Sequence, residues 1–105
     1  MQILKIQNLF SLFKTSKFYL CKVYSSAAEA TKDIKDGAYV CVGGFGLGGT
    51  PNALIEAIRD HGIQNLTVAA NDCGVNDWGL GHLLQSRQIK RFILSFVGEN
   101  KVFEK

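Results

Sequence analysis

Short uncharged apolar runs alternate along this chain with segments whose apolar residues recur every three or four positions. Runs at 39–42 and 66–70 are apolar or β-branched and are bounded by glycine or polar residues, which is typical of buried strands. A similar run predicts a third strand over 92–97. The segments between these runs have the periodicity of helices.

Helix boundaries can be placed from capping residues. Ser26 followed by Glu29 is a capping-box pattern and predicts a helix over 27–34. The spacing of the apolar residues in 80–86 predicts another helix there.

A proline marks the start of the helix between the first two strands. Pro51 suits the first helical position behind Thr50 as N-cap, and His61-Gly62 ends the segment. Alternation of strands and helices in this order predicts an α/β fold with an open, mostly parallel sheet and flanking helices. The apolar strands are expected to be covered on both faces. Three strands with little chain after them predict that the sheet is incomplete in this chain.

Length and charge narrow the classes of protein. A chain of 105 residues accommodates one small domain, and 47% apolar with 20% charged residues excludes a wholly disordered chain. The net charge of +3 comes from four lysines in the first 28 residues, where there is no acid. Residues 29–105 are nearly neutral, which disfavours nucleic-acid binding. No apolar run approaches the ~18 residues of a membrane span.

The basic N-terminal segment has the composition of a mitochondrial transit peptide. Its large apolar residues fall on one side of a helical wheel and its polar residues on the other, with Leu4 out of place. We expect residues 1–22 to be a leader to the mitochondrial matrix and residues 23–105 to form the domain. The alternative is an ordinary first helix of the domain.

Cysteine and histidine patterns predict no metal site. Cys21, Cys41 and Cys73 are odd in number and have no CxxC spacing, and His61 and His82 are not paired at ligand spacing.

A glycine-rich segment follows the first strand and is the feature most indicative of binding. Five glycines occur in the seven positions 43–49, including Gly43, Gly44, Gly46 and Gly49, with Phe45 among them. Such a loop lets backbone N–H groups approach an anion or a thioester oxygen. Parallel strands bind ligands at their carboxyl ends, where 71–73 also lies after the second strand, so the two loops are expected to be neighbours.

The same glycines allow two other interpretations. Gly44, Gly46 and Gly49 satisfy GxGxxG, and with Asp72 after the next strand they are compatible with a nucleotide-binding Rossmann-like module. Against this, Pro51 would remove an interior helix N–H if the helix began within the glycines. The loop can also be only a tight structural connection.

Several motifs together resemble the family I coenzyme A transferases. They are Asp36-Gly37, Gly43-Gly44-Phe45 with Gly49 and Pro51, Gly74-Val75, Trp78-Gly79-Leu80-Gly81, Gln88-Ile89-Lys90-Arg91 and Val97-Gly98-Glu99-Asn100. The resemblance runs from about Lys22 to the end. Two positions depart from it: Cys41 interrupts an aliphatic triplet, and Asp72 stands where the resemblance leads us to expect asparagine.

This resemblance implies transfer of coenzyme A from succinyl-CoA to a 3-oxo acid such as acetoacetate, in ketone body catabolism, through a glutamyl-CoA thioester. It places the nucleophilic glutamate in the C-terminal half of the family's proteins, so that Glu99 is not the nucleophile. We therefore expect an N-terminal piece of an enzyme that is inactive alone, needs the missing C-terminal half, and forms a homo-oligomer when full length.

The resemblance implies no permanently bound cofactor, because the coenzyme A thioester is a substrate. The pocket residues expected in this chain are Gly43, Gly44, Phe45, Gly46, Gly49, Asn71 and Asp72. Asn71 and the glycine loop would donate hydrogen bonds to a carboxylate or a developing oxyanion. The added charge of Asp72 would repel an acid substrate. A rival from another class remains a noncatalytic interaction protein.

Overall fold

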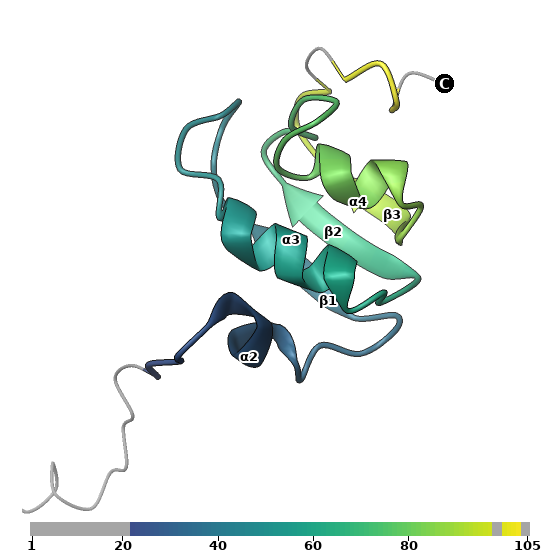
Figure 1. The fold of residues 1–105 in the computed structure, drawn as a ribbon. Helices are drawn as coiled ribbons and strands as arrows, with labels where there is room; N and C mark the ends of the chain where they lie inside the picture. Colours follow the sequence, from purple (N-terminus) through teal and green to yellow (C-terminus); the bar gives the residue numbers. More distant parts are fainter. Residues whose placement is uncertain (1–21, 98–99, 104–105) are drawn as a thin grey trace, which may run out of the picture.

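A computed structural model describes residues 22–97 and 100–103 (Figure 1). The leader expected over 1–22, apart from Lys22, and Glu99 lie outside the described residues. The elements, in chain order, are α2 (Ala27–Thr31), β1 (Tyr39–Val42), α3 (Asn52–Asp60), β2 (Leu66–Ala70), α4 (Gly81–Gln85) and β3 (Ile89–Ile93).

The three strands form one parallel sheet in the order β1-β2-β3. Val68 in the central strand is paired with Val40 on one side and with Phe92 on the other. The predicted α/β fold with an open parallel sheet is therefore confirmed. The strands' carboxyl ends all lie at one edge, toward which the arrow of β2 points in Figure 1.

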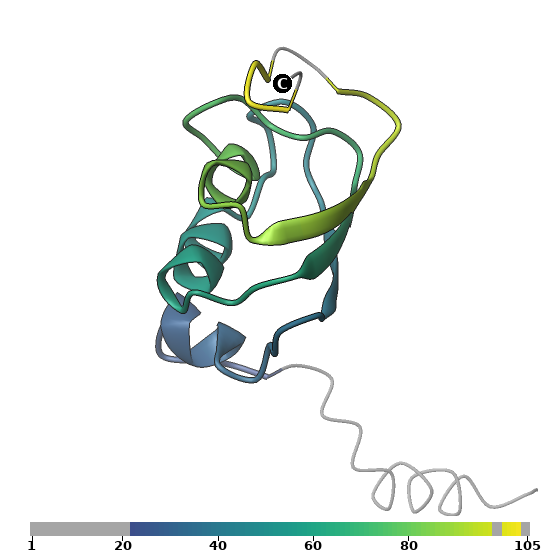
Figure 2. The same ribbon diagram turned by 90° about the vertical axis from the view of Figure 1, so that its right-hand side faces the viewer.

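The helices lie on one side of this sheet, as the view in Figure 2 shows. Alternate strand residues such as Leu66 and Val68 point toward α3 and α4, where Ile55, Ile58 and Leu83 complete a core of almost fully buried side chains. Because side chains alternate across a strand, the pairing register of the strands decides which strand residues face the helices and are buried.

The other face of the sheet has no helix over it among the described residues, so the expectation of cover on both faces is not met there. Tyr39 is 83% exposed and Ile93 is 50% exposed on this face. Cys41 is also exposed and lies in the same row of the sheet as Ile93, with Ala69 of the central strand between them. Covering this face requires polypeptide in addition to the described residues.

The predicted bounds of the third strand, 92–97, are wrong. The strand begins three residues earlier, because Leu66 donates a backbone hydrogen bond to Gln88 and pairs with Ile89. The charged residues Lys90 and Arg91 interrupt the apolar run, so the sequence pattern did not indicate this start. Charged side chains are nevertheless acceptable on an edge strand. The strand ends at Ile93, and the chain then bends so that the N–H groups at 95 and 96 donate to the carbonyl of the residue after β2.

Helix α2 is shorter than the helix predicted over 27–34. Ser26 caps it by accepting a hydrogen bond from the Glu29 N–H, as the capping box predicts. The helix ends at Thr31, whose hydroxyl donates back to the carbonyl of Ala27 at 2.9 Å. Such back-bonding by a β-branched residue disfavours continuation of the helix.

Helix α3 starts at Asn52, whereas the sequence predicted a start at Pro51. Pro51 has φ −78° and ψ 65°, and Asn52 donates to the carbonyl of Thr50 at 2.8 Å, which is the geometry of an inverse γ-turn. Thr50 makes no capping bond to the helix, and its hydroxyl instead approaches the carbonyl of Gly46. Helix α4 agrees with the helix predicted over 80–86 to within one residue at each end.

Among residues 22–97 and 100–103, no helix combines the length and apolar character needed to cross a membrane.

Candidate functional site

The glycine-rich segment forms a tight turn at the carboxyl edge of the sheet. Phe45 and Gly48 exchange two backbone hydrogen bonds of 3.0 Å across two intervening residues. The first of these, Gly46, has φ 57°, and glycine at this place is typical of a type II′ turn. The turn therefore projects from the end of β1 as a small hairpin.

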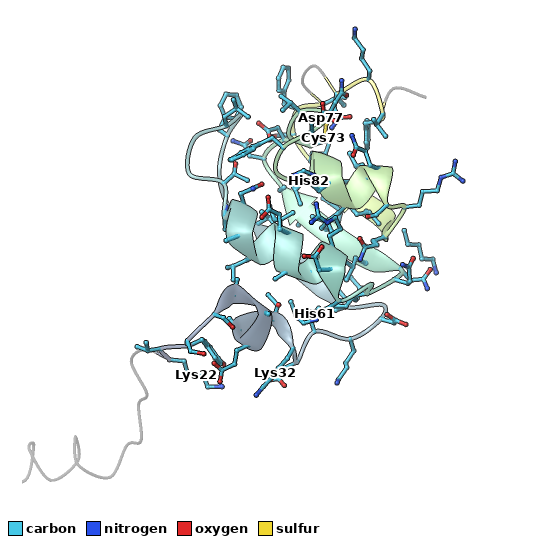
Figure 3. All side chains as sticks on the ribbon, viewed as in Figure 1. Lys22, Lys32, His61, Cys73, Asp77 and His82 are labelled. Carbon is cyan, nitrogen blue, oxygen red and sulfur yellow. The ribbon has the colours of Figure 1, made fainter. Side chains whose placement is uncertain are left out.

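A second loop of similar form follows β2. Val75 and Trp78 are bridged across another two-residue turn. The N–H of Gly79 donates to the side-chain oxygen of Asn52 at 3.0 Å, which ties this loop to the first turn of α3. Figure 3 shows the labelled Cys73 and Asp77 of this loop at one end of the domain and His61 at the other.

Asp72 joins the two loops. One carboxylate oxygen accepts a hydrogen bond from the N–H of Gly46, and the other accepts from the N–H of Gly74 at 3.1 Å. The side chain is 9% exposed. The expectation that the two loops are neighbours is confirmed, and a carboxylate lies between them.

The loops border a small depression that is partly open to solvent. It is lined by Val42, Gly43, Gly44, Thr50, Ala70, Asp72, Gly74 and Leu80. Of the pocket residues expected from the sequence, Gly43, Gly44 and Asp72 lie on it.

Asn71 lies beside this depression and does not line it. Its side-chain oxygen accepts from the Ser95 hydroxyl at 2.6 Å, and its carbonyl accepts the N–H groups of Ser95 and Phe96. The physical reason is the twofold alternation of a strand: Asp72 follows Ala70 on the helix side, and Asn71 follows Ala69 on the open face. Asn71 is therefore positioned by the segment after β3.

Phe45 is outside the core. Its side chain is 60% exposed and stacks on Phe96, which is 56% exposed, with ring centroids 6.3 Å apart. Leu47 and Trp78 are also exposed at this edge. Large apolar groups at the rim of a depression are typical of a surface that contacts a ligand or another polypeptide.

The glycine loop does not have the geometry of a dinucleotide fingerprint. In that motif the third glycine lies within the helix, which begins among the glycines. Here Gly49 has φ 71° and precedes the turn at Pro51, and the helix begins only at Asn52. The spacing matched GxGxxG, but the helix that would hold a pyrophosphate starts too late.

Two amide side chains are buried, which the sequence did not predict. Gln88 is 1% exposed and donates to the carbonyls of Ile63 at 2.8 Å and Ile58 at 3.2 Å, so that it satisfies the end of α3. Asn100 is fully buried and donates to the carbonyl of Cys73 at 3.2 Å. A glutamine or asparagine in sequence gives no signal that distinguishes such burial from exposure.

Among the described residues, the titratable groups at this edge form no cluster for a metal. Within the described part of the chain, no three histidine, cysteine or acidic side chains are gathered to hold an ion. Cys73 is buried with its sulfur against the carbonyl of Val97. Far from this edge, hydrogen bonds from the hydroxyl and N–H of Ser25 lower the pKa of Glu29.

Comparison with known proteins defines the class. A family model described as coenzyme A transferase matches residues 24–105, so the chain belongs to the coenzyme A transferase family. The resemblance inferred from the glycine loop and the later motifs is thereby confirmed.

Several individual proteins of known name are similar to this chain. The chain is 58% identical over 84 residues to a protein of Bacillus subtilis named as a probable subunit of succinyl-CoA:3-ketoacid coenzyme A transferase. It is 51% identical over 83 residues to the corresponding transferase subunit from Helicobacter pylori. It is 41% identical over 97 residues to succinyl-CoA:3-ketoacid coenzyme A transferase 2A, mitochondrial, of Rattus norvegicus.

These matches cover most of this chain and a minor part of each relative. The first covers 80% of the chain and 35% of the Bacillus protein, and the rat match covers 92% of the chain and 19% of the rat protein. The chain thus spans about a third of the length of the bacterial relatives that it matches.

Proposed function

We propose that this chain provides the glycine-loop side of a coenzyme A transferase site that moves coenzyme A from succinyl-CoA to a 3-oxo acid such as acetoacetate. The observation that carries the proposal is the depression where Gly43 and Gly44 meet the loop after β2, in a chain that matches the family over 24–105. The relatives' names supply the donor and the class of acceptor.

The chemistry is an exchange in two halves. A glutamate carboxylate reacts with succinyl-CoA to give a glutamyl-CoA thioester and succinate, and the thioester then reacts with acetoacetate to give acetoacetyl-CoA and the free glutamate. The proposed role of the Gly43 and Gly44 backbone is to contact the acyl oxygen as negative charge develops on it. Coenzyme A enters as a substrate, with no permanently bound cofactor.

The nucleophile is proposed to belong to further polypeptide, either a longer chain or a separate partner chain. The bacterial relatives are named as one subunit of the transferase, and the chain spans only about 35% of the first of them. The exposed aromatic rim at Phe45 and Phe96 borders the depression, so a second polypeptide docked there would lie beside the acyl group. We propose that the 105-residue chain alone is inactive and that, where one longer chain carries both parts, the full-length enzyme is a homo-oligomer.

A graft tests this function. The 84 matching residues of the Bacillus subtilis protein are replaced by those of this chain, and the chimera is combined with the polypeptide that completes that enzyme. We expect succinyl-CoA-dependent formation of acetoacetyl-CoA by the chimera and none by the 105-residue chain. Transfer by the isolated chain, or an inactive chimera that folds and assembles, would contradict the proposal.

Mass spectrometry tests the covalent step in the same chimera. Incubation with succinyl-CoA should add the mass of coenzyme A less water to one glutamate. The modified peptide should lie outside the grafted residues. A modified glutamate within the graft would refute the assignment of the nucleophile to other polypeptide.

We propose the mitochondrial matrix as the location, with residues 1–22 as the leader. The basic, acid-free composition of this segment and the mitochondrial rat relative support it. Residues 1–22 fused to a fluorescent protein should carry it into mitochondria in a manner that depends on the membrane potential. Replacing Lys5, Lys14 and Lys17 by glutamine should abolish import, and a fusion that stays in the cytosol would contradict the proposal.

A further inference from the structure

The Asp72 carboxylate is held as a ligand would be held. It accepts from two backbone N–H groups, one in each loop, and the two donors come from well-separated parts of the chain. Backbone N–H groups that converge on one point form an anion-binding site. In this chain the anion on that site is a side chain of the protein itself.

No cation neutralises this carboxylate among the described residues. The ion pairs there are Arg59 with Asp60 and His82 with Glu56, and neither includes Asp72. A buried charge is tolerated only when strong hydrogen bonds replace its water. Charge-assisted bonds from the N–H groups of Gly46 and Gly74 therefore compensate the charge of Asp72.

An asparagine at position 72 would not satisfy the same two donors. A carboxylate presents an acceptor oxygen to each N–H group, whereas an amide presents one oxygen and an NH₂ group, which would face a second donor. The aspartate is therefore specific to the observed arrangement of Gly46 and Gly74.

We propose that Asp72 is a positioning residue whose carboxylate occupies the anion site of the two loops. It fixes the glycine loop over the depression and excludes free carboxylates from the N–H groups of Gly46 and Gly74. Because the Asp72 carboxylate is bound to Gly46 and Gly74, the backbone of Gly43 and Gly44 in the same depression remains available to the acyl oxygen. This last step rests on the proposed function, and the occupied anion site does not.

Chemical rescue tests the occupation directly. Amide resonances of the ¹⁵N-labelled chain are followed by NMR in the wild type and in Asp72→Ala, with formate as the probe because it replaces the deleted carboxylate. Asp33→Ala is the control, since it removes an exposed carboxylate elsewhere. Formamide, which is uncharged but similar in shape to formate, tests whether shape alone is enough. Sodium chloride tests for an effect of ionic strength.

We expect the Gly46 and Gly74 resonances to move in Asp72→Ala and to return toward their wild-type positions as formate saturates the site. Hydrogen exchange of the Gly46 amide should accelerate roughly tenfold or more in Asp72→Ala, as for loss of one charge-assisted bond. Formate should leave these resonances unchanged in the wild type and in Asp33→Ala. A saturable wild-type response, or unchanged glycine resonances in Asp72→Ala, would overturn the proposal.

A measurement on the wild type covers the case in which Asp72→Ala does not fold. A scalar coupling across the hydrogen bond should connect the Gly46 nitrogen to the side-chain carboxyl carbon of Asp72, and its absence would refute the occupation. These readouts involve no coenzyme A, so they are independent of the failure or success of the chimera. In an active chimera, Asp72→Asn should strengthen inhibition by free succinate several-fold, and unchanged inhibition would refute the exclusion of carboxylates.

Discussion

Replacing Gly44 with alanine should distort the glycine loop because two separate effects oppose a side chain there. Gly44 has φ 112°, where a side chain costs about 1–3 kcal/mol in backbone strain. An added Cβ would also lie 2.9 Å from both the backbone nitrogen and the Cα of Thr50, and 2.6 Å from its hydroxyl oxygen. The hydroxyl can rotate away, but the backbone cannot, and such overpacking costs about 1–3 kcal/mol.

The expected loss of unfolding free energy for Gly44→Ala is therefore about 4 kcal/mol, a large part of the roughly 5–15 kcal/mol that stabilises a typical domain. The adjacent Gly43→Ala is the matched control, because its Cβ would meet nothing within 4 Å. We expect this control to change stability by less than about 1 kcal/mol.

Urea unfolding followed by far-UV circular dichroism measures both variants, and fluorescence of Trp78, the single tryptophan, reports on the neighbouring loop. In the chimera, Gly44→Ala should also abolish transfer. Equal stability of the two variants would refute the argument from backbone conformation and contact.

Two further predictions concern stability and pH. Gln88→Met should lower the unfolding free energy by about 2–3 kcal/mol, because buried carbonyls such as that of Ile63 lose their donor, whereas the exposed Gln64→Met should change it by less than about 0.5 kcal/mol. Equal urea midpoints would contradict the role of this amide. Glu29, whose pKa is lowered by Ser25, should stabilise the first helix above its unfolded pKa and lose this effect as the pH falls through its folded pKa. NMR titration of the Glu29 carboxyl should show a higher midpoint in Ser25→Ala, and an unchanged midpoint would refute the cause.

The open face of the sheet gives a structural reason to expect further polypeptide. Parallel sheets are normally covered on both faces, and here Tyr39 and Ile93 remain exposed on the face away from the helices. The limited span of the chain along its relatives agrees with this interpretation. The stability predictions apply to the chain as it stands, and additional cover would raise the stability of the wild type and the variants together.

Local chemistry made the first two strands, the fold class and the glycine loop predictable. Uncharged apolar runs bounded by glycine and polar residues leave few alternatives to a buried strand, and both Tyr39–Val42 and Leu66–Ala70 were predicted to the residue. Five closely spaced glycines likewise indicate a loop whose backbone is approached closely. These are properties of neighbouring residues, so they can be inferred without knowing what packs against them.

Long-range contacts decided the rest. The start of β3 depends on pairing with Leu66, and the places of Asp72 and Asn71 depend on which face of β2 each one follows. The family resemblance led us to expect both Asn71 and Asp72 in the pocket, whereas the folded protein directs Asn71 to Ser95 and Asp72 to the glycine loop. Hydrogen-bond partners that are distant in the chain are selected by packing, and no local periodicity contains that information.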